Sequence, residues 1–121
     1  MISVRTKHFK MPNGCVYIGD TQDGNSHGWG QYRDHDGFLI YLGQYANGKR
    51  NGKGVNYFSD GSRYEGEWEN DAMDGFGQMS YPDGSRYSGG WKEGKRAGIG
   101  KMTYPDGTVQ KGEWMNDSRV A

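Results

Sequence analysis

One tyrosine returns along this chain at an almost constant interval, and that interval constrains the fold more than any other feature. The tyrosines are Tyr17, Tyr41, Tyr64 and Tyr87, with spacings of 24, 23 and 23 residues. A glycine follows each of them two residues later, and Gly112 holds the same place near the C-terminus. Self-similarity at a period of roughly 20 to 50 residues is typical of a stacked array of one small unit. The sequence therefore predicts a repeat array rather than a globule around a single centre.

The unit that begins at Tyr64 shows what one repeat is. Tyr64, Gly66 and Trp68 alternate with glutamates, so in a strand these three residues share one face and the glutamates share the other. A polar turn is expected over residues 70–74, and a second strand would follow it. Each unit is therefore predicted to be a β-hairpin.

Glycine is a poor strand residue, so its recurrence in the second strand needs a reason. Close approach of a neighbouring ring is the usual one. We expect Gly75 to lie opposite Trp68, and Gly77 to lie opposite Gly66, so that the indole rests on the neighbouring backbone.

The connections follow from the parity of the period. Because 23 is odd, one connection must be even and the other odd if every unit shows the same face. We expect the even loop inside each unit, and an odd loop between units that contains the recurring Asp-Gly step with a left-handed glycine. The first unit has one extra residue, which a bulge near residues 38–40 would absorb.

Hairpins of this kind are marginal alone and must pair laterally. The fold class expected is all-β: an elongated, single-layer antiparallel sheet of stacked hairpins, with roughly ten strands. Residues 1–10 would be a basic extension, and the array would occupy residues 11–121 with a partial last unit from Gln110. A single layer has nothing over its rings, so the ring-bearing face is expected to stay partly open.

Composition agrees with a thin aromatic core. Leu, Ile, Val and Phe total only 15 of 121 residues, but there are four Trp and nine Tyr, and the formal net charge is zero. That combination is unlike a disordered chain, and the lack of a basic excess argues against nucleic-acid binding. Cys15 is the only cysteine, which excludes an internal disulfide and favours a reducing compartment.

A family resemblance rests on the unit that begins at Tyr87. It reads Y-x-G-x-W-x-x-G-K-x-x-G-x-G and continues to Tyr104 and Asp106-Gly107, a pattern that resembles the MORN (membrane occupation and recognition nexus) repeat. Residues 41–109 carry the pattern well, whereas the first unit has Thr21 in the Trp column. The last unit keeps Trp114 and is expected to stop before its second strand, so this indole is expected near an unpaired edge.

The resemblance implies a scaffold rather than an enzyme. Repeats of this family occur in cytoskeletal and ciliary proteins, in membrane-junction proteins and beside lipid kinases and methyltransferases, and the array itself is not the catalyst. It implies either a protein partner, held in a groove or as a second copy, or a phospholipid surface. No catalytic residue, metal ligand set or cofactor site is expected, since the three histidines share no spacing with the repeat.

Two candidate sites follow. The first is an aromatic groove for a protein partner or a second copy, which would consist of Tyr41, Tyr45, Tyr64, Trp68, Tyr87, Trp91 and Trp114. The alternative is a weak lipid or anion site on one rim of the ribbon, which would consist of Lys49, Arg50, Lys95 and Arg96.

The expected location is the cytoplasm, in a cytoskeletal or ciliary assembly by family analogy. No apolar run has the length of a membrane span or of a secretion signal. Residues 1–16 contain Arg5, Lys7 and Lys10 and no acidic residue, which leaves import into an organelle as an alternative.

Overall fold

The computed structural model describes residues 6–121, and within that range it contains strands and turns but no helix. The eleven strands are β1 (Thr6–Lys10), β2 (Val16–Gln22), β3 (Asn25–Arg33), β4 (Leu39–Ala46), β5 (Lys49–Tyr57), β6 (Arg63–Glu69), β7 (Ala72–Ser80), β8 (Arg86–Lys92), β9 (Lys95–Thr103), β10 (Val109–Met115) and β11 (Ser118–Arg119). They form one sheet in sequence order, and every neighbouring pair is antiparallel. The predicted all-β array of stacked hairpins is confirmed.

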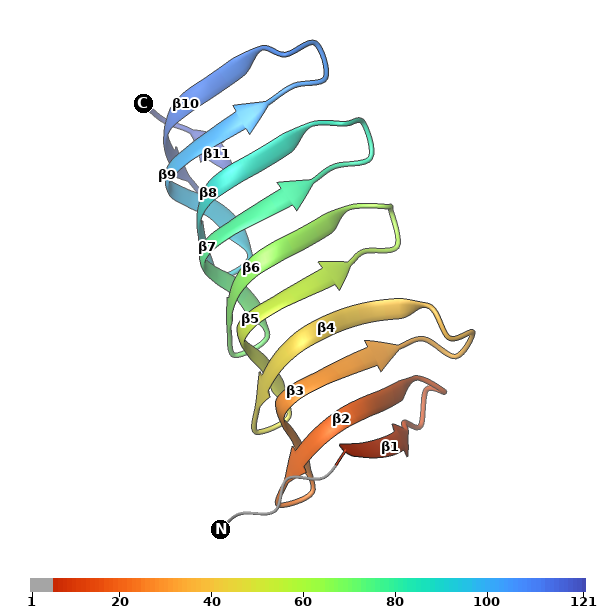
Figure 1. Ribbon diagram of the computed structural model, residues 1–121. Helices are drawn as coiled ribbons and strands as arrows, with labels where there is room; N and C mark the ends of the chain where they lie inside the picture. Colours follow the sequence, from red (N-terminus) through yellow and green to blue (C-terminus); the bar gives the residue numbers. More distant parts are fainter. Residues whose placement is uncertain (1–5) are drawn as a thin grey trace.

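Figure 1 shows the ribbon as a stack of hairpins, each beside the one before it, with strands that bend sharply along their length. Residues 6–10, which the sequence analysis placed ahead of the array, form β1 and pair with β2. Arg5 lies outside the described residues. At the other end, Trp114 pairs with Arg119 of the short strand β11, so the last unit does begin a second strand.

The two kinds of connection have the predicted parity. Inside each unit the loop has two residues, and in the third unit these are Asn70 and Asp71, with φ angles of 48° and 71°. Two consecutive left-handed residues are typical of the type I′ turn, whose twist matches that of the flanking strands. The expected longer turn over residues 70–74 is wrong, because β7 already begins at Ala72. Between units the loop is odd, and Gly61 in the loop over residues 58–62 has a φ of 97°.

The extra residue of the first unit is a bulge, as expected. Tyr32 of β3 pairs with Tyr41, but the next residue, Arg33, pairs with Leu39, which leaves Ile40 without a partner in this register. The bulge keeps the later tyrosines on one face in spite of the longer first period.

A second bulge occurs inside every complete hairpin, and it overturns one predicted pairing. Gly66 does pair with Gly77, but beyond that point the register shifts and Trp68 pairs with Met73. Gly75 therefore does not face Trp68. It pairs with Trp91 of the next unit instead.

The glycine that pairs with Trp68, Trp91 or Trp114 thus belongs to the preceding unit. Trp68 pairs with Gly52, and Trp114 pairs with Gly98. Consequently Trp68, Trp91 and Trp114 pack across the boundary between two repeats, and the indole Nε1 of Trp68, for example, donates to the carbonyl oxygen of Gly54 in the preceding unit.

Candidate partner-binding surfaces

The aromatic side chains predicted to line a groove form the core of the molecule. They alternate edge to face across the sheet: the ring centroids of Tyr41 and Trp68 are 5.5 Å apart, those of Trp68 and Tyr64 are 5.2 Å apart, and those of Tyr64 and Trp91 are 5.3 Å apart. Edge-to-face pairs at this distance are favourable beyond the area they bury. We call this row the aromatic ladder; it consists of Tyr17, Tyr45, Tyr41, Trp68, Tyr64, Trp91, Tyr87 and Trp114.

Seven of the eight ladder rings donate a hydrogen bond to a backbone carbonyl oxygen of the sheet. The hydroxyl of Tyr64 donates to the carbonyl oxygen of Glu67 at 2.9 Å, and the indole Nε1 of Trp68 donates to the carbonyl oxygen of Gly54 at 3.1 Å. The Tyr64 ring covers Gly77, where an added Cβ would overlap the phenol. Burial raises the pKa of Tyr64 above its usual range.

The prediction of a partly open ring face is therefore wrong for a single copy of the chain. The seven predicted groove residues are only 0–9 % exposed, and none of their buried side-chain nitrogen and oxygen atoms lacks a hydrogen-bond partner. The rings need no second layer, because the tyrosines pack over glycine backbone and neighbouring rings cover one another edge to face.

One part of the ring face remains hollow. A cavity of about 310 Å³ lies beside Tyr41 and Tyr45, and Tyr32, Arg50 and Asn56 are among its other lining residues. A substitution in the repeat explains it: a tyrosine occupies the tryptophan column at residue 45. The smaller phenol leaves space that an indole fills in the later units.

Two of the four residues of the predicted basic rim, the arginines, already form ion pairs within the chain. Nε of Arg50 is 3.2 Å from Oδ1 of Asp71, and Nε of Arg96 is 3.3 Å from Oδ1 of Asp117, so both arginines are engaged with the turn of the following unit. Lys49 and Lys95 are exposed, and over residues 6–121 neither makes an ion pair.

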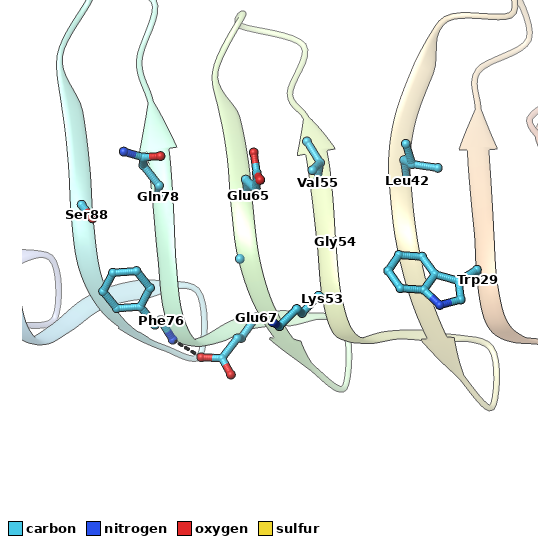
Figure 2. Close-up of a pocket in the computed structure, with 11 residues that line it drawn as sticks. Trp29, Leu42, Lys53, Gly54, Val55, Glu65, Glu67, Phe76, Gln78 and Ser88 are labelled. Atoms are coloured by element: carbon cyan, nitrogen blue, oxygen red, sulfur yellow. Dashed lines mark hydrogen bonds between the residues drawn. The ribbon is translucent and has the colours of Figure 1, made fainter.

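The opposite face of the sheet carries the exposed apolar side chains, and we call it the outer face. Trp29 is 56 % exposed, Phe76 61 % and Leu42 45 %. Together with Val55 they line a shallow groove of about 670 Å³ that extends from β3 to β8. Figure 2 shows Trp29 and Phe76 at its two sides, with Lys53 and Glu67 between them.

Sequence reasoning missed this surface, although a signal for it was present. The side chains in question occupy the middle of the Gly-x-Gly step in each second strand, where Trp29, Lys53, Phe76 and Ile99 recur. Because side chains alternate along a strand, a residue between two ring-face glycines must point to the outer face. Polar side chains are usual on a face that solvent covers, so a large apolar residue at such a position is informative.

The described residues offer no convincing centre for metal chemistry. One group that could share an ion occurs among them, formed by Asp34, His35 and Asp36 in the loop after β3. Oδ1 of Asp34 already accepts the backbone N–H groups of Asp36 and Phe38, each at 2.9 Å, so this carboxylate acts as the cap of its own loop. Residues 6–121 also contain no helix with the length and apolar character that crossing a bilayer requires.

Comparison with known proteins agrees with the geometry of the hairpins. No curated protein matches the chain. The family described as the MORN repeat matches three consecutive units, at residues 41–63, 64–86 and 87–109. Repeats of this family are typically modules that bind proteins or membrane lipids, and they are generally non-catalytic. Since the three matches cover more than half of the 121 residues, the chain belongs to the MORN repeat family.

Proposed function

We propose that this protein is a non-catalytic scaffold that binds a protein partner on the outer face of its sheet. The observation that carries the proposal is the exposure of Trp29, Leu42 and Phe76 around one groove. Exposed apolar side chains that gather in one place, with polar residues around them, are typical of interaction sites. Tryptophan and other aromatic residues supply much of the binding energy at protein interfaces, because they give a large contact area with few rotatable bonds.

The aromatic ladder contributes rigidity to this function. Tyr64, Trp68, Tyr87, Trp91 and Trp114 keep the sheet in one shape, so the outer face loses little conformational freedom when a partner binds.

A lipid surface is the second candidate, and the charges favour it less. Glu65 and Glu67 lie beside Lys53 in the groove, so the outer face carries both signs of charge. On the rim, Lys49 and Lys95 remain, and a single basic residue near an anionic membrane contributes about 1 kcal/mol. Arg50 and Arg96 would have to leave their aspartates to add to that attraction.

The scaffold belongs, in this proposal, to a larger cytoplasmic assembly of cytoskeletal or ciliary type. The support is the family, whose repeats serve as binding modules. Microscopy of the tagged full chain in its own cell tests the location: a filamentous or axonemal pattern agrees with it, and a uniform or organellar signal contradicts it.

Retention of proteins from the native cell extract on the immobilised chain tests the binding function. We expect a defined set of proteins to bind the wild type and the control variant Phe38→Ser, whose exposed ring lies in a loop away from the groove. The same set should be lost with Trp29→Ala and with Phe76→Ser. Retention that survives both groove substitutions would refute the proposed surface.

Vesicles test the lipid alternative directly. Co-sedimentation with vesicles that contain phosphatidylserine should be weak for the wild type and should not change in Trp29→Ala. Strong sedimentation that disappears in the double variant Lys49→Ser and Lys95→Ser would favour a membrane tether over a protein scaffold.

A further inference from the structure

The side chains of the outer face form a row that crosses the strands. From β3 to β8 the residues at this level are Trp29, Gln44, Lys53, Glu67, Phe76 and Gly90. The pairings Trp29 with Gln44, Lys53 with Glu67 and Phe76 with Gly90 place them side by side. We call these six residues the outer row.

Hydrogen bonds connect the other neighbours in the outer row, Gln44 with Lys53 and Glu67 with Phe76. Oε1 of Gln44 accepts the backbone N–H of Lys53 at 2.7 Å, and Oε1 of Glu67 accepts the backbone N–H of Phe76 at 2.6 Å. The order of side chains along the row is therefore a fixed property of the folded chain.

When the outer row of a second copy runs in the opposite direction, its side chains complement those of the first copy. If two copies stack outer face to outer face about a two-fold axis that runs along the strands between β5 and β6, then β5 faces β6, β4 faces β7 and β3 faces β8 of the second copy. An isologous interface of this kind makes every contact twice.

The charges at the centre of the row match under this reversal. Lys53 of one copy faces Glu67 of the second copy, and the reverse contact forms on the other side of the axis. Both side chains are exposed, and over residues 6–121 neither makes an ion pair. The net charge of zero also means that two copies do not repel each other as whole molecules.

The large side chains match as well. Trp29 faces Gly90 of the second copy, which presents no side chain, whereas the same place in the repeat carries Asp20, Gln44, Glu67 and Glu113. Phe76 faces β4 of the second copy, where Gln44 and Leu42 are its nearest outer-face residues. Each aromatic ring thus meets a position that can admit it.

We propose that the partner on the outer face is a second copy of this chain, in an antiparallel dimer about that axis. The proposal rests on the proposed function, since it names the occupant of the same groove. It assigns the specificity to Lys53 and Glu67, and most of the buried apolar area to Trp29 and Phe76.

Sedimentation equilibrium of the full chain over a range of concentrations tests the dimer. We expect a monomer–dimer equilibrium for the wild type and for Phe38→Ser, and a dimer weakened at least about tenfold in Trp29→Ala and in Lys53→Glu, because like charges then meet at the axis. Glu67→Gln keeps the acceptor oxygen for Phe76 and removes the charge, so it should weaken the dimer without changing the unfolding temperature of the monomer, measured at low concentration.

Three outcomes would overturn the dimer. The first is a wild type that is monomeric at about 0.1 mM, which lies well above the micromolar range of modest interfaces. The others are a dimer that Trp29→Ala leaves unchanged and a Lys53→Glu variant that associates as strongly as the wild type. A monomer that still loses its retained proteins in Trp29→Ala refutes the dimer and supports the scaffold with a different partner. A dimer that retains nothing from the extract supports the dimer and refutes the wider scaffold function.

Discussion

The guanidinium carbon of Arg50 lies 4.4 Å from the centroid of the Trp68 ring, so a side chain of one repeat covers the indole of the next. The same guanidinium donates to Asp71, and the backbone N–H of Asp71 donates to the carbonyl oxygen of Arg50 at 2.9 Å. Arg96 repeats this arrangement with Trp114 and Asp117. In an array without a deep core, these contacts between consecutive units supply part of the stability that stacking requires.

Replacing Arg50, which connects two repeats, should lower the free energy of unfolding, whereas replacing its neighbour Lys49 should leave it almost unchanged. Arg50→Ala removes the stacking on Trp68 and the bonds to Asp71, and since both charged groups are partly exposed we expect a loss of about 1 kcal/mol in the free energy of unfolding. Lys49→Ala is the matched control and should change it by less than about 0.5 kcal/mol. Urea unfolding measures both, and equal effects would contradict the linking role.

The glycines under the rings should not tolerate a methyl group. In Gly77→Ala the new Cβ would overlap the phenol of Tyr64, so we expect a loss of about 1–3 kcal/mol or failure to fold. The neighbouring exposed residue gives the control, Gln78→Ala, with an effect below about 0.5 kcal/mol. Thermal unfolding followed by circular dichroism distinguishes the two, and a Gly77→Ala variant as stable as the wild type would show that the ring does not lie there.

The four tryptophans should separate into two classes in fluorescence. Trp29 is 56 % exposed, while Trp68, Trp91 and Trp114 are 5–6 % exposed. At concentrations low enough for the chain to be monomeric, acrylamide should therefore quench one component readily, and Trp29→Phe should remove that component and shift the emission to shorter wavelength. A quenching curve that Trp29→Phe leaves unchanged would mean that this indole is covered in solution.

Alkaline pH should unfold the protein through its buried phenols. Burial raises the pKa of Tyr41, Tyr45 and Tyr64 above the unfolded value of about 10, because the charged phenolate is disfavoured away from water. The stability that these groups contribute is fully present below pH ~10 and is lost as the pH rises toward the raised pKa. Urea unfolding from pH 8 to 11 should show this loss, and Tyr64→Phe should make it less steep; an equal slope would argue against burial of that phenol.

One turn should accept a stabilising substitution. Glu93 opens its type I′ turn with a φ of 51°, a conformation that costs a glutamate more than an asparagine, and Asn47 and Asn70 hold the same place in other units. Glu93→Asn should therefore raise the free energy of unfolding by about 0.5 kcal/mol, and Asn47→Glu should lower it by a similar amount. Thermal unfolding temperatures provide the comparison, and a shift in the opposite direction for either variant would contradict the turn assignment.

The hairpins, their order and their turns could be predicted from the sequence, since these depend on local rules. Alternation of polar and apolar residues determines which face a strand residue occupies, and the odd period determines which loop is even. The pairing of Gly66 with Gly77 and the bulge at Ile40 followed from the same counting. The predicted pairing of Trp68 with Gly75 was wrong because a bulge inside the hairpin shifts the register, so that Trp68 pairs with Met73.

The binding surface could be predicted only in part. Recurring tyrosine and tryptophan columns look the same in sequence whether the rings stand up into solvent or lie flat on glycine. The ion pairs of Arg50 and Arg96 could not be predicted from the sequence either, because each arginine pairs with an aspartate about 21 residues away along the chain. The outer-face residues Trp29 and Phe76 stand out once the ring face is known to be closed.

By itself, the amino-acid sequence determined the repeat length, the secondary structure, the family and the face on which each side chain of a strand lies. The tertiary structure decided which of the two faces is free to bind. The physical reason is that ring orientation depends on contacts between units: the indoles of Trp68, Trp91 and Trp114 each donate to a glycine carbonyl of the unit before, as Trp91 does to Gly77 at 3.1 Å. Those contacts close the aromatic face and leave Trp29, Leu42 and Phe76 exposed on the other.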